Sequence, residues 1–422
     1  MTLRNRELAA LLTVGLLTAI GFATVYIALK SQISGGSLGY AVFFFALYLV
    51  AHVVARFTVP LADPYLLPMA ALLTAIGVTE IYRLGPGDAF RQGLWIVIGV
   101  AAFGATLFWL HRDYRALERY KYVFGVTAIL LLFLPLAPGI GESINGSRLW
   151  IHFGSLQFQP GELGKIALIV FLAAYFREKR EVLAQGRLKD WGPLLAIWGG
   201  AMLVLFATDD LGSALLYYGI FVAMLYIATA RIAFVAGAIG LFLVGAFAVS
   251  RGTPHVRDRV DVWLNPYKYE HTTGYQILQS LYSIAHGGFG GTGLGHGIVN
   301  TPGGQQVVPD LNTDFIYSAL AQELGLVGVA ALLLLYMAFV VRGFQIALTA
   351  SDGFSKLLAA GLSFSFAFQT FVIVGGITRV IPLTGITLPF VSYGGSSVVA
   401  NFLLVAGLLL ISNRANRQEA GA

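Results

Sequence analysis

Twelve apolar segments, each about as long as a membrane-spanning helix, dominate this sequence. A hydrocarbon core about 30 Å thick needs roughly 20 apolar residues in helical form. Only 11% of the residues are charged, whereas roughly 25% of a soluble domain is charged. The sequence therefore predicts an all-α polytopic membrane protein with about 12 transmembrane helices. We expect these helices at 8–29, 37–55, 65–82, 92–110, 120–137, 161–176, 192–207, 211–229, a ninth span ending near 250, 321–341, 355–377 and 389–412.

Basic residues predict the orientation of these helices. The segments 111–121 and 177–189 are strongly basic, and Arg414 and Arg417 follow the last span. Cytoplasmic loops carry an excess of lysine and arginine, and an even number of spans puts both termini on one side. We therefore expect both termini in the cytoplasm and a long polar loop, 251–320, on the extracytoplasmic face. Since the basic residues lie in short loops, the net charge of +6 reflects topology, and we expect no nucleic acid partner.

The long loop is the polar interval that interrupts the apolar pattern. Aromatic and aliphatic residues are spaced through it, which argues against disorder, and long loops in compact proteins are often functional. Its glycines at 287–297 are followed by no Gly-Lys-Ser/Thr and preceded by no strand, which argues against a nucleotide-binding loop. We expect close backbone packing there, and an ordered, partly embedded active-site loop overall.

Asp314 lies where the loop ends and apolar sequence resumes. The run Asn312-Thr313-Asp314 before an apolar segment is typical of a helix N-cap. A general base is the alternative function for this carboxylate. Chain position alone does not decide between them.

Other polar residues lie inside or beside the spans, where ionisable groups are costly and often functional. Glu162 and Lys165 are three residues apart, which places them on one helix face. They form either a structural ion pair or a charged wall of a cavity that receives a polar head group. Asp209 and Asp210 precede a helix, so they either cap it or hold a cation. Arg148 suits a headgroup anchor or a phosphate ligand.

A second glycine cluster, LPFVSYGGSS at 388–397, interrupts the start of the last span. Irregular backbone at membrane depth is tolerated only where protein or a water-filled cavity covers it. We interpret this cluster as the lining of a cavity.

The chain resembles the shape, elongation, division and sporulation family, the group containing RodA and FtsW, with the RodA branch favoured. With the apolar spans around them, the matching stretches cover about residues 63–412 in the family's order. These stretches are QPGELGKIAL (159–168), DLGSALL (210–216), RVDVWLNP (259–266), GYQILQSLYSIAHGGFGGTGLGHG (274–297), TDFIYSALAQELGLVG (313–328) and PLTGITLPFVSYGGSS (382–397).

The resemblance implies an activity, a partner and a place in the cell. It implies a peptidoglycan glycosyltransferase that polymerises lipid II into glycan strands at the outer face of the bacterial cytoplasmic membrane. It also implies a class B penicillin-binding protein as transpeptidase partner. Because the family core usually has ten spans, residues 1–62 are expected to be an added N-terminal helix pair. The core is then 63–415, with a cytoplasmic tail at 416–422.

The resemblance also implies roles for individual residues. Asp314 matches the family's essential aspartate, Glu162 and Lys165 match its paired acid and lysine, and Asp210 matches the acid before its Leu-Gly. Substrate-binding residues are expected within the matching stretches; they are Lys165, Glu162, Arg259, Asp210, Gln279 and Ser392. The chain departs from the family pattern at Asp209, Thr292 and Gln322. Arg148 is also shifted by one position relative to Trp150, which puts a direct role for it in doubt.

The chemistry of sugar polymerisation suits these residue types. A carboxylate can take the proton of an acceptor hydroxyl as general base, and we expect Asp314 to do so. The departing pyrophosphate needs positive charge, from Arg259, Lys165 or a divalent cation such as Mg²⁺ or Mn²⁺. The alternative is a lipid II flippase. Transporters often show paired internal repeats, and the two halves of this sequence contain no corresponding pair of motifs.

Overall fold

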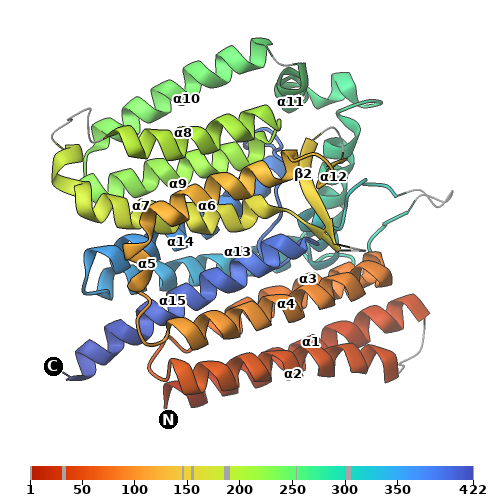
Figure 1. Ribbon diagram of the computed structural model, residues 1–422. Helices are drawn as coiled ribbons and strands as arrows, with labels where there is room; N and C mark the ends of the chain where they lie inside the picture. Colours follow the sequence, from red (N-terminus) through yellow and green to blue (C-terminus); the bar gives the residue numbers. More distant parts are fainter. Residues whose placement is uncertain are drawn as a thin grey trace.

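The computed structural model describes residues 2–30, 35–144, 147–153, 156–184, 191–252, 254–300 and 306–421. Long helices lie side by side in one bundle (Figure 1), and each predicted span has a counterpart among them. These counterparts are α1 (Leu3–Lys30), α2 (Gly35–Thr58), α3 (Leu66–Leu84), α4 (Pro86–Leu110), α6 (Lys121–Phe133), α7 (Pro160–Ala184), α8 (Gly192–Ala207), α9 (Leu211–Thr229), α10 (Ile232–Gly252), α13 (Ile316–Thr349), α14 (Gly353–Ile377) and α15 (Gly395–Gly421).

The prediction of a polytopic, mainly helical membrane protein is confirmed. Within the described ranges, eight helices are long and apolar enough to cross a membrane, and α6, α8 and α10 are shorter apolar helices. Several helices extend beyond the predicted spans. α7 continues through charged sequence to Ala184, and α15 continues through the predicted tail to Gly421.

The structure corrects the purely α-helical prediction in one region. The polar stretch between α6 and α7 forms a three-stranded antiparallel sheet in the order β1-β2-β3. Its strands are β1 (Gly141–Ile144), β2 (Ser147–Phe153) and β3 (Leu156–Phe158). Aromatic and β-branched residues such as Trp150 and Ile151 favour extended structure on a half-buried surface. The short four-residue helix α5 (Ala116–Arg119) and the 3-10 turn η1 (Leu134–Leu136) complete this half of the chain.

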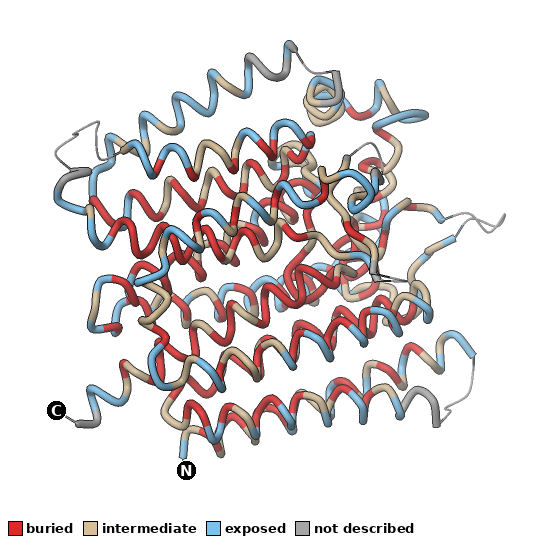
Figure 2. Tube along the Cα trace, viewed as in Figure 1, coloured by how far each residue is buried: buried red, intermediate tan, exposed pale blue. Residues whose placement is uncertain are grey.

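Burial separates central helices from peripheral ones (Figure 2). In the most apolar window of each helix, 89% of the residues are buried in α15 and 83% in α3, but only 28% in α1. Along α10, exposed side chains include Ile239, Leu243 and Phe247. Large apolar side chains that face outward are expected where lipid, rather than water, is the surrounding solvent.

The N-terminal helices α1 and α2 pack against α3 and α4, and buried charges fasten them to the core. Arg4 Nη1 lies 2.5 Å from Glu7 Oε2, and His52 Nδ1 lies 2.6 Å from Glu7 Oε1. Arg4 also donates to the backbone carbonyls of Ala62 and Asp63. The division into an added pair at 1–62, a core at 63–415 and a tail at 416–422 stays a prediction.

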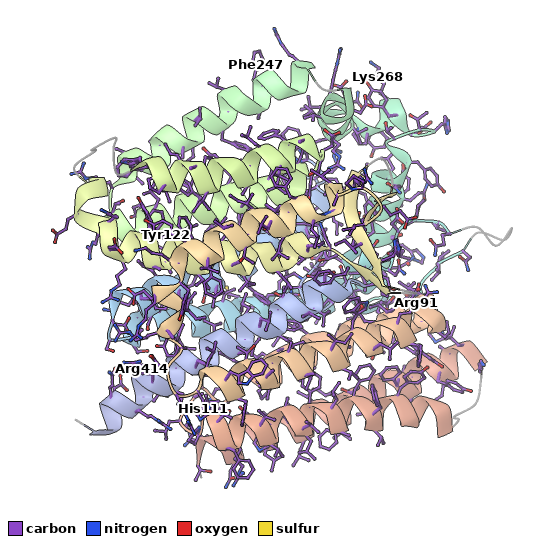
Figure 3. All side chains as sticks on the ribbon, viewed as in Figure 1. Arg91, His111, Tyr122, Phe247, Lys268 and Arg414 are labelled. Atoms are coloured by element: carbon purple, nitrogen blue, oxygen red, sulfur yellow. The ribbon has the colours of Figure 1, made fainter. Side chains whose placement is uncertain are left out.

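The described part of the long loop is ordered, as predicted. It contains α11 (Pro254–Leu264), the 3-10 turn η3 (Pro266–Tyr269) and α12 (Tyr275–Gly287). Both chain termini lie at the end of the bundle opposite this loop (Figure 1). In Figure 3, Lys268 marks the loop end, and His111 and Arg414 mark the end with the termini.

The glycines at 287–297 allow close backbone packing, as the sequence predicted. A Cβ atom at Gly287 would lie 2.1 Å from the carbonyl oxygen of Ala321, and one at Gly291 would lie 2.1 Å from that of Glu323. The Glu323 carboxylate accepts the backbone N–H groups of Gly295 (2.8 Å) and Gly297 (3.1 Å). The glycine-rich turn is therefore held directly against α13.

Candidate active site

The non-helical backbone between α14 and α15 connects most of the predicted site residues. We call residues 383–392 the connecting segment. Pro382 and Pro389 disfavour helix here, and Gly385 has a φ of +73°, a conformation that glycine adopts readily. Because of this segment, α15 begins at Gly395 and not near 389.

Asp314 and Arg259 meet the same turn of the connecting segment. A Cβ atom at Gly385 would lie 3.5 Å from Asp314 Oδ2. Arg259 Nη1 donates to the carbonyl oxygens of Leu383 (3.3 Å) and Thr384 (3.2 Å). The carboxylate and the guanidinium are thus placed on one turn, although they come from opposite ends of the long loop.

The capping alternative for Asp314 is not supported. The N-cap position of α13 falls on Phe315, and no side-chain capping bond is present there. The backbone N–H of Asp314 instead donates to the carbonyl of Asp310 (3.1 Å) in a tight turn. The Asp314 side chain is therefore free of helix capping and available for other chemistry.

The surroundings of Asp314 change its acidity. Burial, reinforced by the negative charge of Asp310, raises the pKa of the Asp314 carboxyl to about 7, and Arg259 opposes the shift. Burial also lowers the pKa of the Arg259 guanidinium, while Asp314 and Asp210 favour its charged form. A carboxyl with a pKa near 7 is well matched to proton transfer near neutral pH.

Asp210 caps a helix, which confirms the capping alternative for this residue. Its side chain accepts the backbone N–H of Ser213 at 2.9 Å at the start of α9. Burial raises the pKa of its carboxyl. A Cβ atom at Gly212 would lie 2.7 Å from the carbonyl oxygen of Thr384, so the start of α9 also abuts the connecting segment. Asp209 beside it has a φ of +55°.

Glu162 and Lys165 form the predicted ion pair on α7. Lys165 Nζ donates to Glu162 Oε2 at 2.9 Å and to Gln369 Oε1 at 2.6 Å. Gln369 Nε2 in turn donates to the carbonyl of Thr387 at 2.9 Å. The pair is therefore linked through one amide to the connecting segment, and the buried Lys165 ammonium donates to two protein oxygens.

Ser392 joins the connecting segment to the Asp314 turn. Its hydroxyl donates to the carbonyl of Thr313 (2.6 Å) and accepts the backbone N–H of Leu388 (2.9 Å). Only 2% of the residue is exposed. The Ser392 hydroxyl already donates one hydrogen bond and accepts another, and the residue is buried. We therefore infer that Ser392 positions the backbone next to Asp314.

Part of the glycine cluster at 388–397 packs closely against protein, and its interpretation as a cavity lining stays a prediction. A Cβ atom at Gly395 would lie 2.1 Å from Trp95, and one at Gly77 would lie 2.4 Å from the carbonyl of Val391. These glycines are required by close helix packing, and the irregular backbone is covered by neighbouring helices.

Two predicted residues lie apart from this group. Gln279 is a partly buried residue of α12, and within the described part of the chain it forms no hydrogen bond to the other candidates. Arg148, in β2, donates to the carbonyl of Gly141 at 3.3 Å across the hairpin. The substrate-binding role of Gln279 stays a prediction.

Sequence reasoning missed two glutamines of the site. Gln92 Nε2 donates to the carbonyl of Ser392 (3.3 Å) and Gln92 Oε1 accepts from the N–H of Gly394 (3.2 Å). Gln369 links Lys165 to Thr387, as described above. Gln369 is the only side-chain amide in the apolar helix α14, and that signal could have identified it, whereas Gln92 lies beside Arg91 in the first turns of α4 and carried no distinguishing signal.

The described residues do not form a resident metal site. No group of three or more histidine, cysteine or acidic side chains is arranged there to hold a metal ion. Magnesium is usually bound by one or two carboxylates together with substrate phosphates, so an ion at this site would depend on the substrate. The expected divalent cation stays a prediction.

Comparison with known proteins places these features in a family. Residues 57–418 match the FtsW/RodA/SpoVE family, described as cell cycle proteins. A peptidoglycan glycosyltransferase RodA from Mycobacterium tuberculosis is 40% identical over 440 residues, covering 99% of this chain and 92% of that protein. Stage V sporulation protein E from Bacillus subtilis is 36% identical over 368 residues, covering 84% and 98%.

Solved structures agree with this assignment. The rod shape determining protein RodA of Thermus thermophilus aligns with a TM-score of 0.60 at 26% identity, covering 84% of this chain and 97% of that one. A chain from a structure of a peptidoglycan synthase complex aligns with a TM-score of 0.70 at 29% identity, covering 85% and 99%. This multi-pass membrane protein belongs to the FtsW/RodA/SpoVE family.

Proposed function

We propose that this protein is a peptidoglycan glycosyltransferase that polymerises lipid II into glycan strands, with Asp314 as the general base. The observation that carries the proposal is the position of Asp314. Its carboxylate has an elevated pKa, serves no helix cap, and shares one turn of the connecting segment with Arg259. Relatives named peptidoglycan glycosyltransferase RodA, 40% identical over nearly the whole chain, support the reaction class.

We give each charged group a distinct task in this reaction. Asp314 takes the proton of the acceptor hydroxyl as that oxygen bonds to the anomeric carbon of the donor sugar. The bond between this carbon and the pyrophosphate oxygen breaks in the same step. Arg259, whose charged form is favoured by two nearby carboxylates, is placed to stabilise the negative charge of the leaving pyrophosphate.

Lys165 receives a different task from the one predicted. Its side chain is 3% exposed and its ammonium donates to Glu162 and Gln369. A buried cation that is already paired with a carboxylate positions the protein better than it binds a departing anion. We assign Lys165 and Glu162 to positioning of the connecting segment, and Arg259 to the pyrophosphate.

The flippase alternative has no structural observation in its favour. Transporter sites usually lie near the middle of the bilayer, between repeated halves. Here Asp314, Arg259 and Asp210 meet beside the long loop, at one end of the bundle. This placement suits chemistry on a sugar held at the membrane surface.

The orientation follows from this function, since lipid-linked sugars are polymerised outside the cytoplasm. We place the loop outside the bacterial cytoplasmic membrane and both termini inside. Because the chain contains no cysteine, single cysteines report on topology without background. A cysteine replacing Lys268 should react with an impermeant thiol reagent in whole cells, whereas one replacing Arg417 should react only after lysis. The reverse pattern would overturn the orientation.

We assign a class B penicillin-binding protein as the transpeptidase partner. The support is the similarity to a chain solved within a peptidoglycan synthase complex. Glycan strands become a wall only when their peptides are crosslinked, so a polymerase and a transpeptidase act on the same product.

The elevated pKa of Asp314 predicts the pH dependence of the reaction. The base accepts a proton only when it is ionised, so the rate should rise as pH increases from about 6 to 8, with a midpoint near 7. An ordinary aspartate, with a pKa of about 3.9, would give a flat profile over this range. Initial polymerisation rates of the purified protein with lipid II, measured under saturating substrate, test this. A flat or falling profile would contradict the assignment.

A further inference from the structure

An apolar groove of about 310 Å³ lies between α2 and α4, outside the site described above. Tyr40, Phe43 and Phe90 line it, and Gly39 and Gly93 leave it open. The residues come from the first turns of both helices, which lie at the loop end of the bundle (Figure 1). The groove therefore opens at the depth of the candidate active site.

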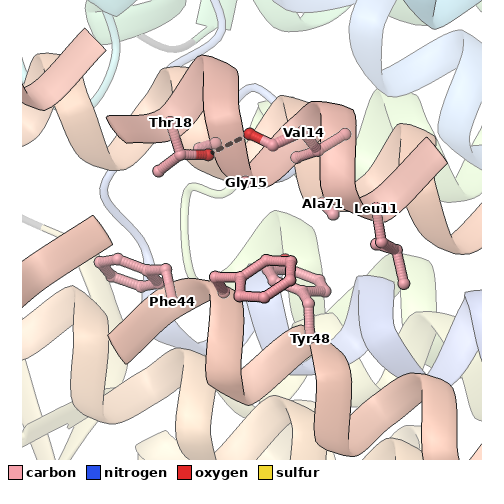
Figure 4. Close-up of a pocket in the computed structure, with 9 residues that line it drawn as sticks. Leu11, Val14, Gly15, Thr18, Phe44, Tyr48 and Ala71 are labelled. Carbon is pink, nitrogen blue, oxygen red and sulfur yellow. Dashed lines mark hydrogen bonds between the residues drawn. The ribbon is translucent and has the colours of Figure 1, made fainter. Parts of the chain in front are cut away.

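The opposite side of α2 is closed, so that the helix forms a fixed wall. Figure 4 shows the interface of α1 and α2, where Leu11, Phe44 and Tyr48 surround a void of about 10 Å³. A void of this size has room for at most about one water molecule, and its apolar lining offers few hydrogen-bond partners. Phe44 also lines the groove, so one side chain separates the packed interface from the open one.

Helix α4 separates the groove from the active site. At 100° per residue, Phe90, Gly93 and Leu94 form one face, and Asp88 and Gln92 lie on the other. That other face contacts the site through two bonds. Asn312 Nδ2 donates to Asp88 Oδ2 at 2.9 Å, and Gln92 Nε2 donates to the carbonyl of Ser392 at 3.3 Å.

A cation lies beside the groove at the same level. Arg91 follows Phe90 on α4, and 52% of its side chain is exposed. Figure 3 places it at the loop end of the bundle. It contacts Asp88 at 3.5 Å and also interacts with Tyr393, and since a guanidinium has five N–H donors, donors remain for an anion. An apolar channel with an arginine at its outer end matches an amphiphile that has an anionic head and a hydrocarbon tail.

We propose that the groove between α2 and α4 binds the polyprenyl chain of the lipid-linked substrate. The proposal rests on the function proposed above. A groove of about 310 Å³ lies at the lower end of the range of roughly 300–1,000 Å³ for ligand pockets. It suits a flexible chain but not a partner helix, whose diameter is about 10–12 Å. The pyrophosphate would leave the groove near Arg91 and pass over the start of α4 to the turn that holds Asp314.

Photocrosslinking tests the occupant directly. A benzophenone amino acid replaces Phe43 in one protein and Phe90 in another, and replaces Leu243, on the exposed face of α10, in the control. All carry Asp314→Asn so that substrate is not consumed, and all are reconstituted in phosphatidylglycerol vesicles with lipid II. We expect lipid II adducts at the two groove positions and only phospholipid adducts at Leu243. Phospholipid adducts alone at all three positions, or adducts with a protein chain, would overturn the proposal.

A groove-filling variant tests the consequence for activity. A Cβ atom at Gly93 would lie 3.8 Å from Phe44 Cζ, in ordinary van der Waals contact, and Gly93 lines the groove, so Gly93→Leu places a side chain in the groove. The matched control is Gly199→Leu on α8, where a Cβ atom meets nothing within 4 Å.

Displacing about two methylene groups of the tail corresponds to a ~10-fold weaker interaction. We therefore expect Gly93→Leu to raise KM for long-tailed lipid II about 10-fold, with kcat unchanged. A short-tailed lipid II analogue should react equally well with Gly93→Leu, Gly199→Leu and the parent protein. An equal loss on both substrates would overturn the proposal. Failure of the proposed function is distinguishable, because the parent protein would then polymerise neither substrate.

Discussion

Glycan polymerisation by the Asp314→Asn protein should fall by at least ~10²-fold, the usual contribution of a general base. Asparagine keeps the size of the side chain and removes the proton acceptor. Since Asp314 makes no capping bond to α13, the substitution removes no hydrogen bond from that helix. The measurement is the initial rate of polymer formation from lipid II by purified proteins at pH 8.

Stability provides the control for this substitution. A carboxyl whose pKa rises to about 7 on folding favours the folded state while protonated, and this contribution is lost as pH rises from about 4 to 7. At pH 8 the ionised, buried Asp314 is therefore a cost that asparagine removes. The variant should unfold at the same temperature as the parent protein or higher. An inactive variant that unfolds well below the parent would point to a structural role.

Loss of the Lys165 ammonium should have the largest effect on stability. In Lys165→Met, the largely buried Glu162 carboxylate loses its cationic partner. Breaking a buried ion pair in this way usually costs about 3–5 kcal/mol of stability. Gln369 also loses the donor that holds its amide toward Thr387. We expect a lower unfolding temperature and a lower polymerisation rate.

Two double variants distinguish the pair from the individual residues. Lys165→Met with Glu162→Gln removes both charges and should recover most of the stability. Exchanging the residues, Glu162→Lys with Lys165→Glu, keeps the pair but faces Gln369 with a carboxylate. The Gln369 amide oxygen, which accepts from Lys165 in the parent protein, would then face a carboxylate. The Gln369 amide cannot turn its N–H groups toward this carboxylate and still donate to the Thr387 carbonyl. The exchange should therefore restore stability more than activity; full activity would mean that only the pair matters.

The helices and the ion pair on α7 could be predicted from the sequence because their signals are local. Each span is a continuous apolar run, and an ion pair at Glu162 and Lys165 follows from helical spacing alone. The essential role expected for Asp314 came from the resemblance, since its position before an apolar run is equally typical of a cap. The structure argues against the cap, because the N-cap position falls on Phe315, and the catalytic role stays a prediction.

The remaining features depend on contacts between residues far apart in the chain. Arg259 meets Thr384 across 125 residues, and Lys165 meets Gln369 across 204. No periodicity or spacing reports such contacts, so the sequence did not predict that the connecting segment joins these residues. The small sheet was missed because its strands are short, with four, seven and three residues. Its register depends on pairing between β1 and β2, such as Glu142 with Trp150.

The most direct test of the account is a reconstitution that separates polymerisation from transport. The purified protein is placed in vesicles with fluorescent lipid II on the outer leaflet, and glycan polymer and lipid translocation are measured in the same sample. The account predicts polymer from the parent protein, little or none from Asp314→Asn, and no translocation above empty vesicles by either. Translocation by both proteins without polymer, or long glycan strands from Asp314→Asn, would contradict it.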